Sequence, residues 1–188
     1  MGQSGLRPSE AINLRHRDLD LAGIEDAVFV VGSSYTPAPE RFLAPGESRD
    51  RPLKGRGAKY RRRVPIPPQL VRQLRDHLGE RGDERPDVFV FPNTDGGRID
   101  LSNFSRDVWN DARQDVFPAG SPLRKVRRHD LRHSAITAWL NAGVPIKTAQ
   151  LWSGHRTAST LLDTYLGVMR HDEALGRARI EQAFGSTD

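Results

Sequence analysis

The sequence contains no cysteine. Disulfide bonds, a thiolate nucleophile and any cysteine-ligated zinc or iron–sulfur site are therefore excluded. It also lacks a run of about 18 apolar residues, which a membrane-spanning helix needs, and a charged segment leading into an apolar one, as in a secretory signal. Hydrophobic residues make up 36% of the 188 residues, which is low but sufficient for a core. We therefore expect an intracellular protein that is not associated with a membrane.

Positive charge is in excess, because 29 Lys and Arg residues face 24 Asp and Glu residues. The cations cluster: ten lie between Arg49 and Arg75, where Asp50 is the one acid, and more lie between Arg124 and Arg128. Such clusters neutralise phosphates, although a solvated surface has the same composition. Nucleic acid is the expected partner. The candidate DNA-contacting residues are Arg56, Lys59, Arg61, Arg62, Arg63, Lys125, Arg127 and Arg128.

Hydrophobic periodicity predicts an α+β fold, mainly α, with a small antiparallel sheet near the front. We expect a strand at 27–31, a loop over 32–45, a hairpin around 55–57 and an amphipathic helix over 67–79 that stops at Gly79. In the second half we expect a helix beginning at Ser102, whose Val108 faces the core with its apolar neighbours. The further helices are expected at about 129–141, 145–153, 158–168 and 172–184.

The segment from His129 to His133, HDLRH, carries two histidines one helical turn apart. This spacing also occurs in zinc sites, but Arg132 lies between the imidazoles and no third ligand is evident. A role in helix capping or packing is a second possibility. In a third, His129 and Arg132 share a helix face, where an imidazole and a guanidinium suit a reacting phosphate.

Three further segments contain candidate site residues, each with a simpler alternative. Arg7 stands at the start of a helix. It is either a phosphate-binding residue that Glu10 helps to orient, or an exposed arginine. Lys54 precedes a glycine-rich turn. Its ammonium either reaches into a DNA groove or is simply exposed to solvent. His155 follows a helix-ending glycine, and Tyr165 stands ten positions later, as a reactive residue or as a buried tyrosine with a bonded hydroxyl.

The order of these motifs resembles the catalytic domain of the tyrosine recombinases, the phage-integrase and Xer-type family. The series runs GLRPSEA, a lysine in a basic segment before VPIP, HDLRH, SGH and then tyrosine, and covers nearly the whole chain. The resemblance implies the tyrosine-recombinase catalytic fold over residues 1–170, followed by a C-terminal helix over 171–188. The spacing from His155 to Tyr165 is one residue longer than in many members.

The resemblance implies a role for each matching residue. Tyr165 is the nucleophile that attacks a DNA phosphodiester, and Arg7 and Arg132 hold the non-bridging oxygens. Lys54, with Lys59 as a rival, protonates the leaving 5′-oxygen. His129 assists proton movement at Tyr165, and His155 bonds the phosphate. The product is a 3′-phosphotyrosyl link that another 5′-hydroxyl reverses, with neither cofactor nor metal.

The family resemblance also implies double-stranded DNA as partner, a homotetramer formed through the C-terminal helix, and a cytoplasmic, nucleoid-associated location. Folding of that helix onto its own core is the alternative. Family members carry an N-terminal DNA-clamping domain and helices ahead of the first motif, and neither is visible here. We therefore expect a fragment with weak DNA affinity and with Leu6 and Leu14 partly exposed. A catalytically inactive DNA-binding remnant is the alternative function.

Overall fold

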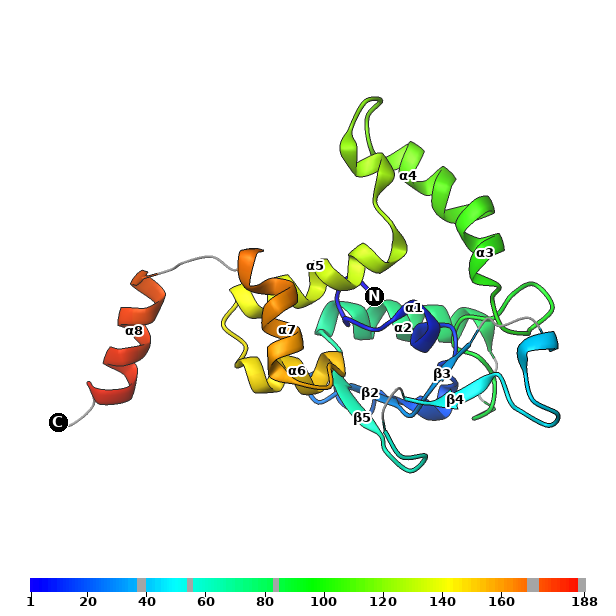
Figure 1. Ribbon diagram of the computed structural model, residues 1–188, viewed down its shortest axis with the longest axis horizontal. Helices are drawn as coiled ribbons and strands as arrows, with labels where there is room; N and C mark the ends of the chain where they lie inside the picture. Colours follow the sequence, from blue (N-terminus) through cyan, green and yellow to red (C-terminus); the bar gives the residue numbers. More distant parts are fainter. Residues whose placement is uncertain (37–39, 54–55, 83–84, 169–172, 186–188) are drawn as a thin grey trace.

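The computed structural model describes residues 1–36, 40–53, 56–82, 85–168 and 173–185 (Figure 1). Helices predominate in these segments and two small antiparallel sheets lie in the first half of the chain, so the predicted α+β, mainly α class is confirmed. Within the described segments, no helix is both long and apolar enough to span a bilayer.

The sheets pair differently from the prediction. Strands β1, β2 and β5 form one antiparallel sheet in that order, and β3 and β4 form another. The predicted hairpin around 55–57 is therefore wrong, because its flanking strands β4 and β5 belong to different sheets. The predicted loop over 32–45 contains a strand, β3. The strands are β1 (Leu19–Asp20), β2 (Val28–Val31), β3 (Ser33–Tyr35), β4 (Asp50–Pro52) and β5 (Arg62–Pro65).

A first hydrophobic core forms where this sheet meets the N-terminal segment and helix α2. Phe29 of β2 pairs with Val64 of β5, and both side chains are buried. Leu6 and Leu14 belong to the same core and are only 2% and 3% exposed. The expectation that these two leucines lie partly exposed is therefore wrong, since the sheet and α2 cover them.

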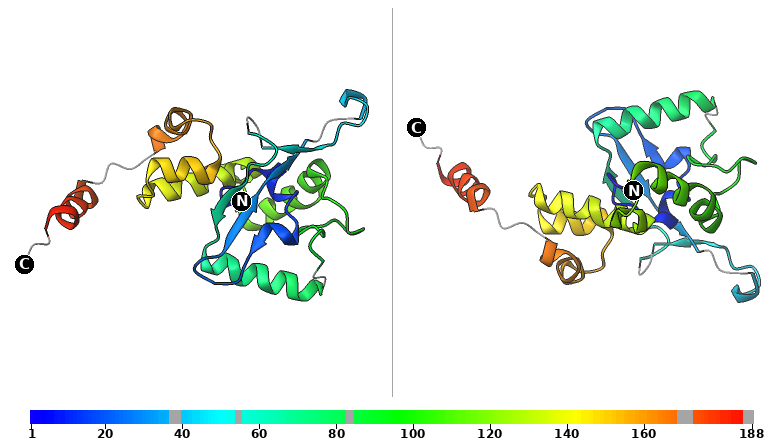
Figure 2. Two further views of the ribbon diagram at one scale, coloured as in Figure 1. Left: turned by 90° about the horizontal axis from the view of Figure 1, so that it is seen from below. Right: turned by 90° about the horizontal axis from the view of Figure 1, so that it is seen from above.

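Helix α2 (Pro68–Arg81) packs on the first sheet through Val71 and Leu74 (Figure 2). A proline in its first turn suits the helix start, where a missing N–H costs nothing. The helix continues past the predicted stop at Gly79 and ends at Gly82, whose φ of 63° is the left-handed value that favours glycine. Gly79 was a poor stop signal because its helical backbone needs no positive φ.

A helical rod projects from the body of the molecule (Figure 1). It consists of α3 (Leu101–Phe104), a π-helical turn (Ser105–Trp109) and α4 (Asn110–Val116). Asp100 caps it instead of the predicted Ser102: one carboxylate oxygen accepts bonds of 2.8 Å from two backbone N–H groups. Val108 is 50% exposed, so the predicted apolar face does not enter the core.

The second core gathers three helices: α5 (Arg128–Asn141), α6 (Ile146–Ser153) and α7 (Ala158–Tyr165). Ile136, Ala149, Leu161 and Tyr165 meet inside it. A 3-10 turn (Leu166–Val168) follows α7. These three helices confirm the prediction for this part of the chain, with bounds shifted by a few residues. Helices α5 and α6 end at or near a glycine of positive φ, whereas α7 continues into the 3-10 turn.

Helix α8 (Glu173–Phe184) stands apart from the three-helix core (Figures 1 and 2). The guanidinium of Arg179 reaches back and donates to the backbone carbonyl of Gly143 at 3.2 Å, just beyond the end of α5. Ile180 and Phe184 are 62% and 84% exposed. Both of these apolar side chains are therefore directed to solvent.

A buried ion pair ties the short helix α1 (Pro8–Ala11) to strand β5. Glu10 accepts two bonds from Arg62, at 2.8 and 3.1 Å, and a third from Arg7 at 2.9 Å. Glu10 is 1% exposed and Arg62 3%. Burial alone raises the pKa of Glu10, but the charge and hydrogen bonds of Arg62, followed by those of Arg7, bring this pKa below its ordinary value.

The placement of Arg62 corrects its assignment as a DNA-contacting residue. Its two terminal nitrogens bond a carboxylate inside the protein, so its side chain belongs to the interior and not to the basic surface. Glu10, by contrast, orients a neighbouring arginine, as expected from the sequence, because its carboxylate also accepts the backbone N–H of Arg7.

Replacing the buried carboxylate tests this ion pair. We expect Glu10→Gln to lower the free energy of unfolding by about 3–5 kcal/mol, because one charged partner is left buried. Denaturant unfolding measures this change. The lowered pKa predicts that the contribution of Glu10 is present above the ordinary glutamate pKa and is lost as pH falls through the lower folded pKa. The acid side of the stability profile should therefore flatten in Glu10→Gln.

The matched control is Glu173→Gln, which breaks an exposed pair with Arg177 on α8 and should leave stability unchanged. An equal response of the two variants would show that burial of Glu10 adds nothing.

A second substitution tests the three-helix core. Leu161 is fully buried, so we expect Leu161→Ala to cost about 2–5 kcal/mol of unfolding free energy through lost burial and the cavity left behind. Leu166→Ala makes the same chemical change at a position that is 66% exposed and should have little effect. Denaturant unfolding of both variants measures the difference, and similar values would contradict the described packing.

Candidate active site

Arg132 lies at the centre of the candidate site. Its guanidinium is buried and donates to the carbonyl of Gly5 at 2.5 Å and to the carbonyl of Ser153 at 2.7 Å. Burial, followed by the charge of Arg7, lowers the pKa of Arg132 to about 10. The group remains a cation at neutral pH, and its position is fixed by two backbone segments far apart in the sequence.

Arg7 approaches the same turn from the start of α1. It precedes the first residue of α1, and its side chain is 33% exposed. One terminal nitrogen bonds Glu10 and the other donates to the carbonyl of Gly154 at 3.3 Å. Two predicted phosphate-binding arginines thus meet at consecutive residues of one turn, and both retain N–H groups for an anion.

Gly154 leaves room for the guanidiniums of Arg62 and Arg7 beside this turn. It ends α6 with a φ of 70°, and a Cβ atom there would lie 2.4 Å from a guanidinium nitrogen of Arg62 and 3.4 Å from one of Arg7. A larger residue would suffer both backbone strain and a steric clash. The sequence indicated that this glycine ends a helix, and the structure adds its close contact with Arg62 and Arg7.

His155 is held beside the arginines by polar groups of α6. Its Nδ1 lies 2.8 Å from the Ser153 hydroxyl, and the Gln150 amide donates to its backbone carbonyl at 3.2 Å. Burial, then the charges of Arg132 and Arg7, lower the pKa of His155 to about 4. The imidazole is therefore neutral at pH 7 and acts through hydrogen bonds. Sequence reasoning did not identify Gln150, since its role depends on the path of the turn.

Tyr165 closes the site from α7. The residue is 2% exposed, and its ring centroid lies 6.0 Å from that of His155 and 5.6 Å from that of His133. The phenol oxygen lies 2.8 Å from Nδ1 of His133. Burial raises the pKa of Tyr165, whereas the charges of Arg132 and Arg7 act in the opposite direction. Both its burial and its bonded hydroxyl match the simpler sequence alternative, yet it lies among the candidate site residues.

His129 lies one turn before His133 on α5, and the two rings meet edge to face at 4.9 Å. Partial burial, followed by the charges of His133 and Arg132, lowers the pKa of His129. The predicted role of His129 in proton movement stays a prediction. Within the described part of the chain, no group of three His, Asp or Glu side chains is placed to hold a metal, so the zinc hypothesis gains no third ligand there.

Lys54, the first choice for the general acid, lies outside the described residues. Lys59, its rival, is exposed in the segment between β4 and β5. Nearby, the guanidinium of Arg56 stacks over the ring of Tyr60, 4.9 Å from its centroid. The other cations of the proposed surface, apart from the buried Arg62, are also at least partly exposed: Arg61, Arg63, Lys125, Arg127 and Arg128.

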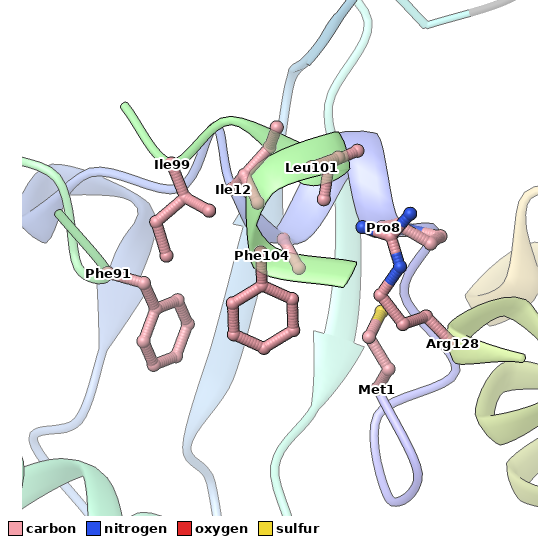
Figure 3. Close-up of a pocket in the computed structure, with 9 residues that line it drawn as sticks. Met1, Pro8, Ile12, Phe91, Ile99, Leu101, Phe104 and Arg128 are labelled. Carbon is pink, nitrogen blue, oxygen red and sulfur yellow. The ribbon is translucent and has the colours of Figure 1, made fainter. Parts of the chain in front are cut away.

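A cavity of about 230 Å³ lies between α1 and α3 (Figure 3). Its lining is almost entirely apolar and includes Ile12, Phe91 and Phe104, while Arg128 lies at one end. None of the five described catalytic candidates lines this cavity. The cavity therefore belongs to the packing of the rod against α1 and not to the candidate site.

Comparison with curated proteins gives relatives along most of the chain. It is 32% identical over 179 residues to the tyrosine recombinase XerA of Pyrococcus furiosus, covering 94% of this chain and 51% of the relative. It is 28% identical over 177 residues to a tyrosine recombinase XerC-like protein of Caldanaerobacter subterraneus, covering 88% of this chain and 43% of the relative. The chain thus spans about half the length of these curated relatives.

Two solved structures share the fold. The Tn1549 transposon integrase matches with a TM-score of 0.65 at 19% identity, covering 98% of this chain and 56% of that one. A XerA recombinase matches with a TM-score of 0.59 at 20% identity, covering 96% and 54%. The family described as "Phage integrase family" matches residues 1–171, which include every candidate catalytic residue. By this match, the chain belongs to the phage integrase family.

Proposed function

We propose that this chain is the catalytic part of a site-specific DNA recombinase in which Tyr165 attacks a DNA phosphodiester. The observation that carries the proposal is the meeting of three groups at the turn 153–155. Arg7 and Arg132 bond its backbone carbonyls, and the ring of Tyr165 lies 6.0 Å from that of His155. The relatives named as tyrosine recombinases support it, as does a structural neighbour solved in complex with transposon right end DNA.

In this proposal the two arginines bind the scissile phosphate. Arg7 and Arg132 contact its non-bridging oxygens, whose negative charge grows as a fifth oxygen approaches phosphorus. The backbone carbonyls that fix the guanidiniums keep them from reorganising during the reaction. His155, neutral at pH 7, adds a hydrogen bond without bringing a third cation into the site.

The covalent step exchanges one ester bond for another. The oxygen of Tyr165 loses its proton and bonds phosphorus, while the bond from phosphorus to the 5′-oxygen breaks. The leaving oxygen takes up a proton from the acid, for which Lys54 is proposed and Lys59 is the alternative. A 3′-phosphotyrosyl link results, and because it keeps an ester bond, attack by another 5′-hydroxyl rejoins the strand without a nucleotide cofactor.

The same arrangement favours an enzyme over a binding-only remnant. A remnant would need only the exposed cations, whereas here a tyrosine hydroxyl is hydrogen-bonded to an imidazole beside two anchored guanidiniums. For the DNA surface we retain Arg56, Lys59, Arg61, Arg63, Lys125, Arg127 and Arg128. We propose that the protein works on the nucleoid in the cytoplasm, where its double-stranded substrate lies.

Trapping of a covalent complex tests the proposal. A pool of nicked duplexes of randomised sequence lets the short strand diffuse away after cleavage, which prevents rejoining. We expect a denaturant-resistant protein–DNA adduct with the wild type and with Tyr60→Phe, and none with Tyr165→Phe. Gel electrophoresis of labelled DNA measures the adduct. Formation of an adduct by Tyr165→Phe would contradict the assignment of the nucleophile, and salt-sensitive binding without any adduct would favour a remnant.

We further propose that α8 docks on a neighbouring copy and so builds a homotetramer on DNA. The exposure of Ile180 and Phe184 supports docking of α8 over folding back, because their apolar surface is left uncovered within one chain.

The assembly proposal predicts that Phe184→Glu reduces tetramers on DNA to smaller complexes, because a charge replaces the apolar contact. Sedimentation of the protein–DNA complex measures the stoichiometry. Val116→Glu places the same charge at a 71% exposed position on α4 and should leave assembly intact. Unchanged tetramers with Phe184→Glu would contradict the proposed contact.

A further inference from the structure

The hydroxyl of Tyr165 has a hydrogen-bonding partner that the sequence did not identify. Its oxygen lies 2.8 Å from Nδ1 of His133, within the range of a direct hydrogen bond. The two rings are tilted by 48°, with centroids 5.6 Å apart. His133 comes from α5 and Tyr165 from α7, so the packing of the two helices brings the imidazole to the reactive oxygen.

We infer that His133 is a further catalytic residue, whose Nδ1 accepts the proton of the Tyr165 hydroxyl as that oxygen attacks the phosphate. This inference rests on the proposed function, because it needs Tyr165 to be the nucleophile. It adds to that proposal the group that removes the proton, a role that the sequence interpretation gave to His129.

Geometry favours His133 over the two other imidazoles. In the described part of the chain, the hydrogen-bonding partner of the phenol oxygen is Nδ1 of His133. The ring of His129 packs edge to face with that of His133, with centroids 4.9 Å apart, and His129 lies one helical turn closer to the start of α5. Nδ1 of His155 is already occupied by the hydroxyl of Ser153 at 2.8 Å. A proton acceptor must lie within hydrogen-bonding reach of the proton that it removes.

The place of His133 in the fold suits a proton acceptor. Arg132 is the preceding residue in the chain, and its guanidinium is anchored by the carbonyls of Gly5 and Ser153. A neutral imidazole carries its proton on one nitrogen, so a proton on Nε2 leaves Nδ1 free to accept from the phenol. Because Arg132 and His133 are neighbours on one helix, the phosphate clamp and the proton acceptor have a fixed relative position.

The step balances without another reactant. The O–H bond of Tyr165 breaks, and its proton moves to Nδ1 of His133, which becomes an imidazolium. The phenol oxygen bonds phosphorus, and the 5′-oxygen leaves with a proton from the proposed general acid. When a 5′-hydroxyl rejoins the strand, it gives its proton back to the proposed general acid and bonds phosphorus. The phenol oxygen then leaves phosphorus and takes its proton back from His133.

Chemical rescue distinguishes proton transfer from a structural role. Under single-turnover conditions with the nicked duplexes, we expect His133→Ala to form the adduct about 100-fold more slowly than the wild type. Added imidazole should restore part of this rate, because a free base can enter the space that the side chain leaves. His133→Gln should stay slow in buffer, since an amide bonds the hydroxyl but does not take up its proton.

The matched control is Ser134→Ala, the next residue on α5, whose exposed hydroxyl bonds only a backbone carbonyl within the helix. It should form the adduct at the wild-type rate with or without imidazole. Wild-type rates for His133→Ala or His133→Gln, or a slow His133→Ala that imidazole does not accelerate, would overturn the inference. Absence of an adduct with the wild type would instead overturn the proposed function.

A measurement that needs neither turnover nor DNA tests the same contact. Nitrogen-15 NMR distinguishes a protonated ring nitrogen from an unprotonated one. In the full chain we expect the Nδ1 of His133 to be unprotonated, with a shift that moves in Tyr165→Phe as the hydrogen bond is lost. A proton on Nδ1 would show that the imidazole donates to the phenol, which overturns its role as acceptor.

Discussion

The candidate site depends on the two hydrogen bonds that Arg132 donates to backbone carbonyls. The guanidinium joins Gly5, ahead of the first helix, to Ser153, at the end of α6. A buried cation is costly unless hydrogen bonds satisfy it, and here main-chain oxygens do so instead of a neutralising carboxylate. Arg132 therefore keeps its positive charge for an incoming anion while holding together the two segments that carry Arg7 and His155.

The charges around Arg132 give the candidate site an excess of positive charge. Glu10 is the buried anion, but Arg62 and Arg7 share it. The neighbouring histidines do not add to this charge at neutral pH where burial and the arginines lower their pKa, as at His155 and His129. Under the proposed function, a DNA phosphate supplies the missing negative charge, and substrate binding relieves repulsion that folding alone leaves in place.

Local sequence signals indicated which residues belong to the candidate site, but they did not indicate which contacts those residues make. Arg7, Arg132, His155 and Tyr165 were assigned from ordered motifs. Helices α5 and α6 end near Gly143 and Gly154, which are turn signals visible in the sequence. The fold class followed from periodicity in the same way. Each of these inferences needed only residues that are close in the chain or a family pattern.

The errors came from interactions between distant segments. Strand pairing joins β2 to β5 across more than thirty residues, so the flanks of the glycine-rich turn gave no sign of their true partners. Arg62 resembled its exposed neighbours because its partner, Glu10, lies far away in the sequence. His133 was visible in HDLRH, but its contact with Tyr165 arises only when α5 packs on α7. The charge and spacing of residues in a sequence do not show which side chains are buried in the fold.

Gly154 imposes an unusual limit on how this protein can change over evolutionary time. Arginine, histidine or tyrosine at a working position has at least a chemically related substitute, whereas a residue without a side chain has none. The left-handed backbone and the crowding by two guanidiniums both act at this residue. We therefore expect this turn to tolerate substitution less well than the outer surface does.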